Sequence, residues 1–400
     1  MAERYDVVVV GGGLLGCLTA WMAARDGARV LLADKDQINQ HASGRNAGSL
    51  HFQLEYRMVE RGKEAARVAA EAMPLHLDAA ALWARMEDEV GEPLGVRRSG
   101  GLMIAESADQ VGTLEFKAGL ERSWGLGVRT LDRAELDTVA PYLAPTVVAA
   151  NLSALEGKAD ARLAAPAVAR AASAAGATVR TRSRLDRADR VPGGWHLTFR
   201  ETDHAGGEHD RTVRAAAVVL ATGVWTTGLG RLFHARLPTV PLALTMTVTA
   251  KVPPLIPHLV QHAGARLSLK QSLDRTVLIG GGWPARLITN ADGTPAFDLK
   301  HQPTVPSVAG NARAAVNAVP ALERIPVVRT WVGTTTVAPD QLPLVGAVKD
   351  TPGVFVATGG SAFTLGPSFA RLLTGLIAGR APDIDLAPYD PARFEEGSTS

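Results

Sequence analysis

The strongest hydrophobic pattern in the chain lies near its N-terminal end. Residues 6–10, an Asp followed by four valines, predict a buried strand; three glycines follow, and apolar residues then continue as a helix to about Arg25. The glycines and the polar residues after Arg25 interrupt this stretch, so a strand, a turn and a helix explain it better than a membrane span. No other segment reaches about 18 uninterrupted apolar residues. We therefore expect a soluble, cytoplasmic protein without a transmembrane segment.

Strands and helices alternate in the same way further along the chain. The apolar spacing predicts, in chain order, a strand at 29–33, a helix at 163–175, a strand at 177–181, a hairpin at 193–215 and a strand at 217–220. A final apolar helix follows the segment 354–367. Helices that alternate with buried strands are typical of an α/β protein.

The glycines after the first strand have the spacing of a dinucleotide-binding fingerprint, Gly11-x-Gly13-x-x-Gly16. The first glycine permits the turn, the second lets the backbone approach a pyrophosphate, and the third lets helix and strand pack closely. The N-terminus of the helix offers unpaired N–H groups to the anion. The second strand ends at Asp34, 18 residues beyond Gly16, close to the spacing of about 20 for the acid that binds the ribose hydroxyls. The acid disfavours NADP, whereas NAD and FAD both use this unit.

Composition narrows the picture in three respects. The chain has 400 residues, 46% of them hydrophobic and 20% charged, which predicts a globular protein of two or three domains. Its 42 basic and 40 acidic residues almost cancel, so we expect no nucleic-acid partner. The single cysteine, Cys17, excludes an intramolecular disulfide and a multi-cysteine metal site. His204 and His209 belong to the predicted hairpin loop, and we expect no bound metal.

A run of small residues at 42–50 decides between the two dinucleotides. We read it as a loop whose backbone can lie against a phosphate or a flat ring. The fingerprint, Asp34 followed by Lys35, and Ala-Ser-Gly at 42–44 together resemble the D-amino-acid oxidase family of FAD enzymes, which includes glycine oxidase and the sarcosine oxidases. The segments 217–225, 331–346 and 354–367 support the resemblance. The middle segment, 266–283, looks most like the catalytic subunits of multi-subunit sarcosine, opine and hydroxyproline oxidising enzymes.

The resemblance implies a domain arrangement and a set of cofactor contacts. It implies a discontinuous Rossmann-type FAD-binding domain, residues 1–80, 145–228 and 326–400, with an inserted α+β substrate domain, residues 81–144 and 229–325, built on a mixed or antiparallel sheet. It implies FAD, bound non-covalently in preference to a covalent link through His51. The FAD contacts that it implies are Gly11, Gly13, Leu14, Leu15, Gly16, Asp34, Lys35, Ser43, Gly44, Arg45, Asn46, Gly48, Ser49, Leu50, Leu185, Ala221, Thr222, Gly223, Trp225, Gly333, Asp340, Gly359, Gly360, Thr364 and Leu365.

The resemblance also implies the reaction, which is oxidation of a CH–NH bond by hydride transfer to flavin N5, followed by hydrolysis of the imine. The substrate would be an amino acid, an N-substituted amino acid or an opine. The nitrogen lone pair drives hydride loss, so the pocket must disfavour the ammonium form, by desolvation or by a nearby positive charge. His51, after the small-residue run, and Lys270, on a middle strand, are the first catalytic candidates. The resemblance to subunits of larger enzymes further implies partner subunits or a separate electron acceptor.

One position departs from the family pattern. Amino-acid oxidising relatives have Trp-x-Gly-x-Arg-Pro, in which the Arg holds the substrate carboxylate, whereas this chain has Thr335 at that place. A hydroxyl cannot replace a guanidinium fork, so we treat Thr335 as a specificity position. Either Lys270, Arg286 or Arg57 holds the carboxylate, or the substrate amine lacks one. A second alternative is a subunit of a larger complex that binds FAD without oxidising an amine and acts as a scaffold or an electron relay.

Overall fold

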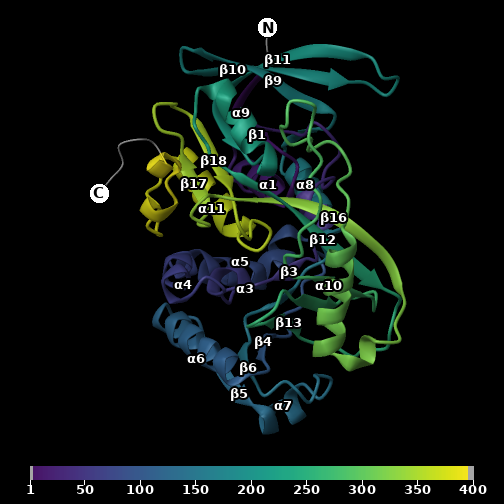
Figure 1. Ribbon diagram of the computed structural model, residues 1–400. Coiled ribbons are helices and arrows are strands. Elements are labelled where there is room, and N and C mark those ends of the chain that lie inside the picture. Colours follow the sequence, from purple (N-terminus) through teal and green to yellow (C-terminus); the bar gives the residue numbers. More distant parts are fainter. Residues whose placement is uncertain (1–2, 395–400) are drawn as a thin grey trace.

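The computed structural model describes residues 3–394; residues 1–2 and 395–400 lie outside the described part of the chain. Two large sheets occupy opposite ends of the molecule (Figure 1). The first sheet has the order β17-β18-β11-β1-β2-β8, and β10 and β9 extend it beside β11. Its strands are β1 (Glu3–Val10), β2 (Val30–Ala33), β8 (Thr178–Arg180), β9 (Ser183–Val191), β10 (Gly194–Thr202), β11 (Glu208–Leu220), β17 (Leu344–Ala347) and β18 (Val354–Thr358).

The centre of the first sheet is parallel and buried. β1 pairs in parallel with β2 and β11, and β11 pairs in parallel with β18. The four valines of β1 at 7–10 are all buried, as expected for a strand that is covered on both faces. Helix α1 (Leu14–Arg25) packs against α8 (Ala164–Ala174) and α11 (Gly366–Ile377) on this sheet. The α/β fold class is thereby confirmed.

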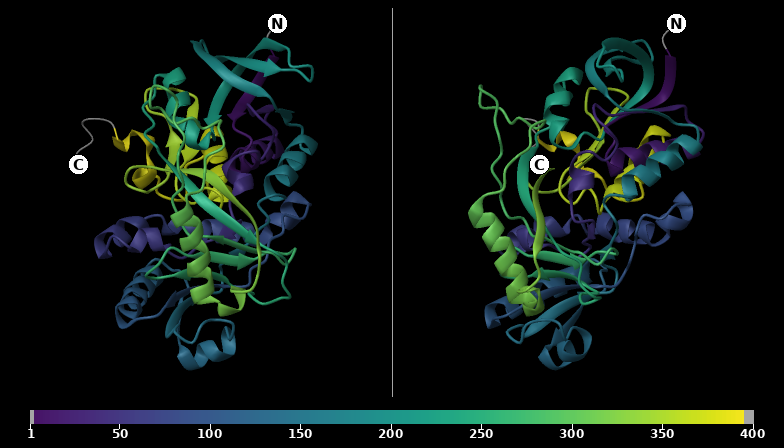
Figure 2. Two further views of the ribbon diagram at one scale, coloured as in Figure 1. Left: turned by 45° about the vertical axis from the view of Figure 1, so that its right-hand side comes forward. Right: turned by 90° about the vertical axis from the view of Figure 1, so that its right-hand side faces the viewer.

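The second sheet is mixed and has the order β16-β12-β15-β14-β13-β4-β6-β5. Its strands are β4 (Gly101–Ala105), β5 (Arg129–Asp132), β6 (Ala149–Ser153), β12 (Val240–Thr249), β13 (Leu259–His262), β14 (Ser268–Gln271), β15 (Val277–Gly280) and β16 (Val327–Val337). Helix α10 (Val305–Ala318) packs on β12 and β15, and α6 (Ala108–Ser123) packs on β4, β5 and β6 (Figure 2). A separate core of buried aliphatic side chains fills this half.

Short elements and two helices connect the halves. α5 (Met73–Val90) contacts α11 of the first half, and α4 (Lys63–Ala70) contacts α6 of the second. The other elements are α2 (Ala42–Arg45), β3 (Ser49–Leu50), α3 (Tyr56–Val59), α7 (Arg133–Val139), β7 (Gly157–Lys158), α9 (Thr226–Gly230), and the 3₁₀ turns η1 (Gly223–Trp225), η2 (Arg231–Phe233), η3 (Pro320–Leu322), η4 (Ala387–Tyr389) and η5 (Pro391–Phe394). Among the described residues, no helix is both long and apolar enough to cross a membrane.

Two features differ from what the sequence patterns predict. The small-residue run at 42–50 is not a continuous loop, because it contains the helical turn α2 and the strand β3, which pairs with β7. In addition, β6 and β16 fall inside the ranges assigned to the FAD-binding domain, yet they pair with β4 and β12 of the second sheet. The chain thus returns to the first sheet later than this division implies, after β6 rather than at residue 145 and after β16 rather than at residue 326.

Candidate active site

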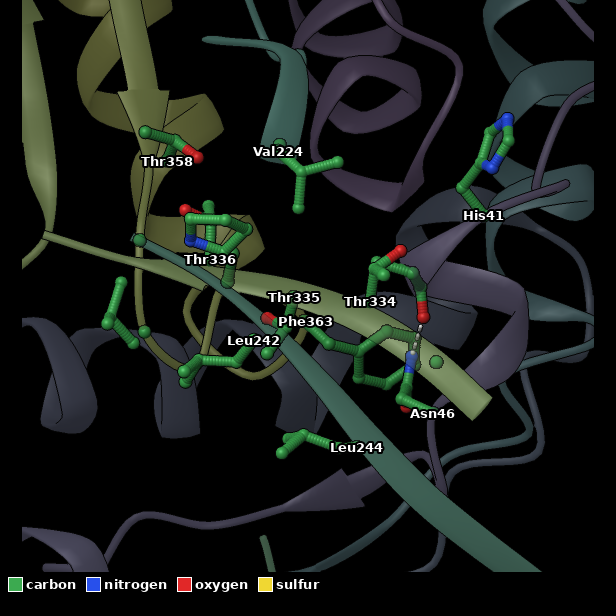
Figure 3. Close-up of a pocket in the computed structure, with 18 of the residues that line it drawn as sticks. His41, Asn46, Val224, Leu242, Leu244, Thr334, Thr335, Thr336, Thr358 and Phe363 are labelled. Carbon is green, nitrogen blue, oxygen red and sulfur yellow. Dashed lines mark hydrogen bonds between the residues drawn. The ribbon is translucent and has the colours of Figure 1, made fainter. Parts of the chain in front are cut away.

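A cavity of about 1020 Å³ lies between the two sheets. On one side it is bounded by the glycine turn after β1 and by the ends of β2 and β11, and on the other by β12, β14 and β16. Figure 3 shows Leu242 and Leu244 on β12 and the three threonines 334–336 on β16 around this space. The cavity is at the upper end of the size range of ligand sites, so it has room for a large cofactor.

The glycine turn brings the backbone and the end of α1 to the cavity. Gly11 has a φ of +110°, and a Cβ there would lie 2.4 Å from the carbonyl oxygen of Ala221. At Gly16 a Cβ would lie 1.8 Å from the carbonyl oxygen of Gly11, which explains the close packing of helix and turn. Gly13 is the N-cap of α1 and has no side chain to cap it, although Leu14 N donates to Ser43 Oγ at 3.0 Å. The helix dipole and the remaining N–H groups of the first turn form an anion-binding end.

Asp34 is held rigidly at the end of β2 and lines the cavity. Its Oδ2 accepts a hydrogen bond from Gly12 N at 2.5 Å, and its Oδ1 accepts one from Asp36 N at 2.7 Å. Lys35 beside it forms ion pairs with Asp36 and with Asp298, which lies in the loop after β15. The acid and the glycine turn therefore meet at one edge of the cavity, as the fingerprint requires.

Most of the predicted FAD contacts line the cavity. Those that line it are Gly11, Gly13, Leu15, Asp34, Lys35, Ser43, Arg45, Asn46, Ser49, Leu185, Ala221, Thr222, Gly223, Trp225, Gly333, Gly359, Gly360 and Thr364. Those outside the lining are Leu14, Gly16, Gly44, Gly48, Leu50, Asp340 and Leu365. Of these, Asp340 is paired elsewhere, because its carboxylate accepts a hydrogen bond from Arg393 Nε at 2.7 Å.

The catalytic candidates are separated by the fold. His51 and Thr335 both line the cavity, and Thr335 pairs with Leu242 across the β12–β16 ladder. Lys270 is buried outside the lining, where its Nζ donates to the carbonyl oxygen of Ala159 at 3.0 Å. Burial, together with the nearby charge of Lys158, lowers the pKa of Lys270 to about 7. The catalytic roles of His51 and Lys270 stay predictions.

Arg57 is a cavity residue that sequence reasoning had named only as an alternative cation. Its guanidinium donates to Gln341 Oε1 at 3.2 Å, to Glu55 Oε1 at 3.2 Å and to Ser361 Oγ at 3.1 Å. Burial raises the pKa of Glu55, but the charge of Arg57 and the hydrogen bonds from Ser361 and Arg57 outweigh it and hold this pKa at about 2. Glu55 and Arg57 therefore form an ion pair at the cavity wall. Arg286, the other alternative, is not among the lining residues.

Ser268 and Arg266 are two of the polar cavity residues that the sequence patterns do not single out. Both line the cavity near the start of β14. Ser268 Oγ lies 3.1 Å from His51 Nε2, whereas the Arg266 guanidinium donates to the Gly282 carbonyl oxygen at 3.3 Å. The period-two alternation of the strand that carries Lys270 contains Ser268 as well, and this was the available signal. Ser268 lines the cavity and Lys270 does not, because the cavity reaches only the start of β14.

The fold and this site define a dinucleotide-dependent oxidoreductase, and comparison with known families identifies which one. A family model described as DAO, FAD dependent oxidoreductase, matches residues 6–376. The chain belongs to this family of FAD-dependent oxidoreductases. The family resemblance, the enzyme class and FAD as the cofactor are thereby confirmed.

Several characterised proteins are similar to this chain over most of its length. Glycine oxidase of Geobacillus kaustophilus (strain HTA426) is 27% identical, and the match covers 98% of each chain. A subunit of the opine oxidase of Rhizobium meliloti is 26% identical, also over 98% of each. Mitochondrial sarcosine dehydrogenase of Homo sapiens is 27% identical over 98% of this chain, but that match spans 42% of the human protein.

Solved structures support the same fold. The crystal structure of glycine oxidase from Geobacillus kaustophilus superimposes with a TM-score of 0.81 and 25% identity, covering 98% of this chain and 100% of the other. L-proline dehydrogenase from P. horikoshii superimposes with a TM-score of 0.83 at 21% identity, with 99% of each chain covered. At 21% identity, the similarity to L-proline dehydrogenase shows a shared fold and nothing further.

The residues present fit FAD. The glycine turn leaves a cradle that a Cβ at Gly11 would fill, the N-terminal end of α1 faces the cavity, and Asp34 lies at the edge of the cavity. In addition, Ser49 Oγ and Gln261 Nε2 are buried polar atoms without hydrogen-bond partners in the described part of the chain, and both residues line the cavity. Buried polar groups are normally paired, so these atoms indicate where a polar ligand binds.

Proposed function

We propose that the protein oxidises the CH–NH bond of an N-substituted amino acid in this cavity. The observation that carries the proposal is that the glycine turn, the apolar side chains of Leu242 and Leu244, and the Arg57 guanidinium all line the same cavity. Bound FAD would supply the hydride acceptor, its N5. The relatives named as a glycine oxidase, a sarcosine dehydrogenase and an opine oxidase subunit support an amino acid or an N-substituted amino acid.

The chain would hold FAD through the elements that meet at the first sheet. The end of α1, with Gly13, would bind the pyrophosphate, Asp34 the ribose, and the backbone of Leu185 would lie near the adenine. We propose non-covalent binding, because Cys17 is buried in α1, where burial raises the pKa of its thiol, and His51 Nε2 already contacts Ser268. Denaturation in acid followed by filtration should then leave all yellow colour in the filtrate. Colour that stays with the protein would contradict non-covalent binding.

Arg57 is our candidate for the carboxylate site. Of the three cations that the sequence offered, Arg57 is the one that lines the cavity. On β12, Leu242 and Leu244 provide an apolar surface for an N-substituent, and Thr335 opposite them leaves the space that an arginine would occupy. A substrate with a substituted nitrogen fits this combination better than a bare α-amino acid.

The test is anaerobic flavin bleaching by pairs of amines with and without a carboxylate. Charge-assisted hydrogen bonds contribute about 1.5–3 kcal/mol, so Arg57→Ala should raise KM for the carboxylated amine by about 10- to 150-fold and leave its decarboxylated analogue almost unchanged. The double variant Glu55→Gln/Arg57→Ala removes the carboxylate that the single variant leaves unpaired. The exposed cavity residue Arg61 provides the control variant Arg61→Ala. Equal effects on both amines would exclude Arg57 as the carboxylate site.

The same experiment tests the electron-relay alternative. Bleaching by any amine demonstrates catalysis, whereas yellow colour that persists with every amine favours a subunit that only relays electrons. We also propose that the chain works with partner subunits. The names of two relatives support this, because the opine oxidase relative and the hydrogen cyanide synthase relative HcnC of Pseudomonas aeruginosa are both named as subunits. Copurification of a tagged chain from its own cells, followed by native mass spectrometry, tests whether partner subunits are bound.

A further inference from the structure

A cluster of fully buried charged side chains lies behind the cavity wall that carries His51. Glu156, Glu121 and Lys117 each have no exposed surface. Charged groups are almost never buried to this degree unless a structural or functional need holds them there. None of the three lines the cavity, so they do not contact a ligand directly.

Glu156 holds the segment that follows His51. Its Oε1 accepts hydrogen bonds from the backbone N–H groups of Phe52 and Gln53, both at 2.9 Å, and its Oε2 accepts one from Gln53 Nε2 at 3.0 Å. These bonds fix the carboxylate and the backbone next to His51 in one arrangement. The same Oε1 lies 4.0 Å from His51 Nδ1.

Glu121 also holds the backbone of this segment, but it forms no contact with His51 among the described residues. Its Oε1 accepts a hydrogen bond from Leu54 N at 2.6 Å, and its carboxylate forms an ion pair with Lys117 Nζ at 2.7 Å. Lys117 Nζ also donates to Gln53 Oε1 at 2.9 Å. The two buried glutamates therefore support the same short segment, and only Glu156 faces the imidazole.

The surroundings of His51 determine which ring nitrogen carries a proton. Nδ1 is buried, has no hydrogen-bond partner in the described part of the chain, and faces the Glu156 carboxylate. A lone pair directed at a carboxylate is repelled, whereas an N–H is attracted, so electrostatics places the proton on Nδ1. Nε2, which lies 3.1 Å from Ser268 Oγ, is then the hydrogen-bond acceptor at the cavity. The distance to Glu156 is long for a hydrogen bond, and catalytic hydrogen bonds commonly shorten when ligand is bound.

We propose that Glu156 is a positioning residue that makes His51 Nε2 the proton acceptor for the substrate amine. This inference rests on the proposed function, because an amine arrives mainly as its ammonium form. The ammonium N–H bond breaks, a bond from that proton to His51 Nε2 forms, and the electron pair stays on the nitrogen, where it can drive hydride loss. The imidazolium that results is stabilised by the Glu156 carboxylate. The arrangement is similar to the histidine and carboxylate of the serine–histidine–aspartate triad, in which the carboxylate orients the imidazole and stabilises the imidazolium.

Other titratable groups near His51 do not replace Glu156. Glu55 is already paired with Arg57 and accepts a hydrogen bond from Ser361 Oγ at 2.7 Å. His76, on α5, is buried, and burial, together with the charge of Arg57, lowers its pKa to about 4, so it is neutral at neutral pH. Among the described residues, His51 is the basic side chain that lies within 4.0 Å of Glu156.

The first measurement needs no substrate. Ring ¹⁵N spectra of the FAD-loaded wild-type protein, assigned with His51→Gln, should show Nδ1 protonated and Nε2 unprotonated. In Glu156→Gln this preference should be lost, whereas in Glu121→Gln, the matched control in the same buried network, it should remain. A wild-type ring with its proton on Nε2 overturns the proposal by itself, whether or not any variant folds.

The second measurement is the pH dependence of anaerobic flavin bleaching. General base catalysis contributes about 10²- to 10⁴-fold, so Glu156→Gln should lower the rate at saturating amine by that order at pH 7, with little change in KM. The deficit should shrink as the pH approaches the pKa of the amine, because a free amine needs no proton acceptor. Glu156→Asp, which keeps the charge, should restore much of the rate. A deficit that is constant with pH, or equal in Glu121→Gln, overturns the proposal. If no amine bleaches the wild-type flavin, the proposed function fails, and the spectra still decide the role of Glu156.

Discussion

Lys117 is the side chain whose loss we expect to destabilise the protein most. It is fully buried on α6, with its Nζ 2.7 Å from Glu121 Oε1 and 2.9 Å from Gln53 Oε1. Lys117→Met keeps an unbranched side chain of similar length and removes the charge. The Glu121 carboxylate then stays buried without its cation.

The buried ion pair sets the expected loss in the free energy of unfolding of Lys117→Met. Breaking a buried ion pair by removal of one partner costs about 3–5 kcal/mol. At an unfolding entropy of about 2.1 cal/mol/K per residue, a chain of 400 residues should melt roughly 4–6 °C lower. Circular dichroism of the FAD-loaded protein measures this shift. Lys251→Met provides the control because Lys251 is exposed, and its Tm should change by less than about 1 °C.

The deficit of Lys117→Met should also depend on pH. Burial raises the pKa of Glu121, and Lys117 opposes that rise, so the variant should raise this pKa further. A carboxyl group whose pKa is raised on folding contributes stability at low pH and loses it as the pH rises through the folded-state pKa. The Tm deficit should therefore be smaller at pH 5 than at pH 8, and Lys117→Met/Glu121→Gln should recover part of it at pH 8. A variant that melts within 1 °C of wild type at pH 8, or a deficit that grows as the pH falls, would refute this reasoning.

Three further substitutions test the cavity. Gly16→Ala would place a Cβ 1.8 Å from the Gly11 carbonyl oxygen, so we expect a loss of about 1–3 kcal/mol of stability together with weaker FAD retention; unchanged urea unfolding and flavin content would contradict this. Asp298→Ala removes the partly exposed ion pair with Lys35 at the cavity edge, worth up to about 1 kcal/mol, and should speed FAD release on dilution by up to about fivefold; a slower release would argue against a retaining contact. Thr335→Arg should lower KM for a small α-amino acid by about tenfold or more and exclude bulky N-substituents, as steady-state assays on both substrates would show; an unchanged preference would remove Thr335 from the specificity site.

Local sequence patterns predicted the first half of the fold well. The strand, turn and helix at the N-terminal end appear as β1, the glycine turn and α1, which ends at Arg25 as the pattern indicates. This succeeded because the signals are local: β-branched residues favour a strand, and glycines permit a turn that a side chain would block. The hairpin at 193–215 was equally visible, although β11 continues without a break to Leu220.

The small-residue run at 42–50 was harder to read. Its lack of large side chains suggested a loop, yet Ala42–Arg45 form a helical turn and Ser49 pairs with Lys158. Pairing partners more than 100 residues away cannot be read from local composition. The same limit applies to β6 and β16, whose place in the second sheet depends on distant strands.

The dinucleotide unit, the α/β class and the family can be predicted from the sequence, because each is encoded in short motifs whose geometry is local. Which polar residues share the cavity depends on how distant parts of the chain pack together. On β14, Ser268 and Lys270 point to the same face, but Ala159 covers Lys270 while Ser268 meets His51. Glu156 is far from His51 in the sequence, and the pairing of β3 with β7 brings the two side chains close together. The spacing of residues along the chain does not predict this contact. A motif specifies how the backbone turns, whereas the partners of a buried charge depend on the whole fold, since only packing brings distant charges within a few ångströms.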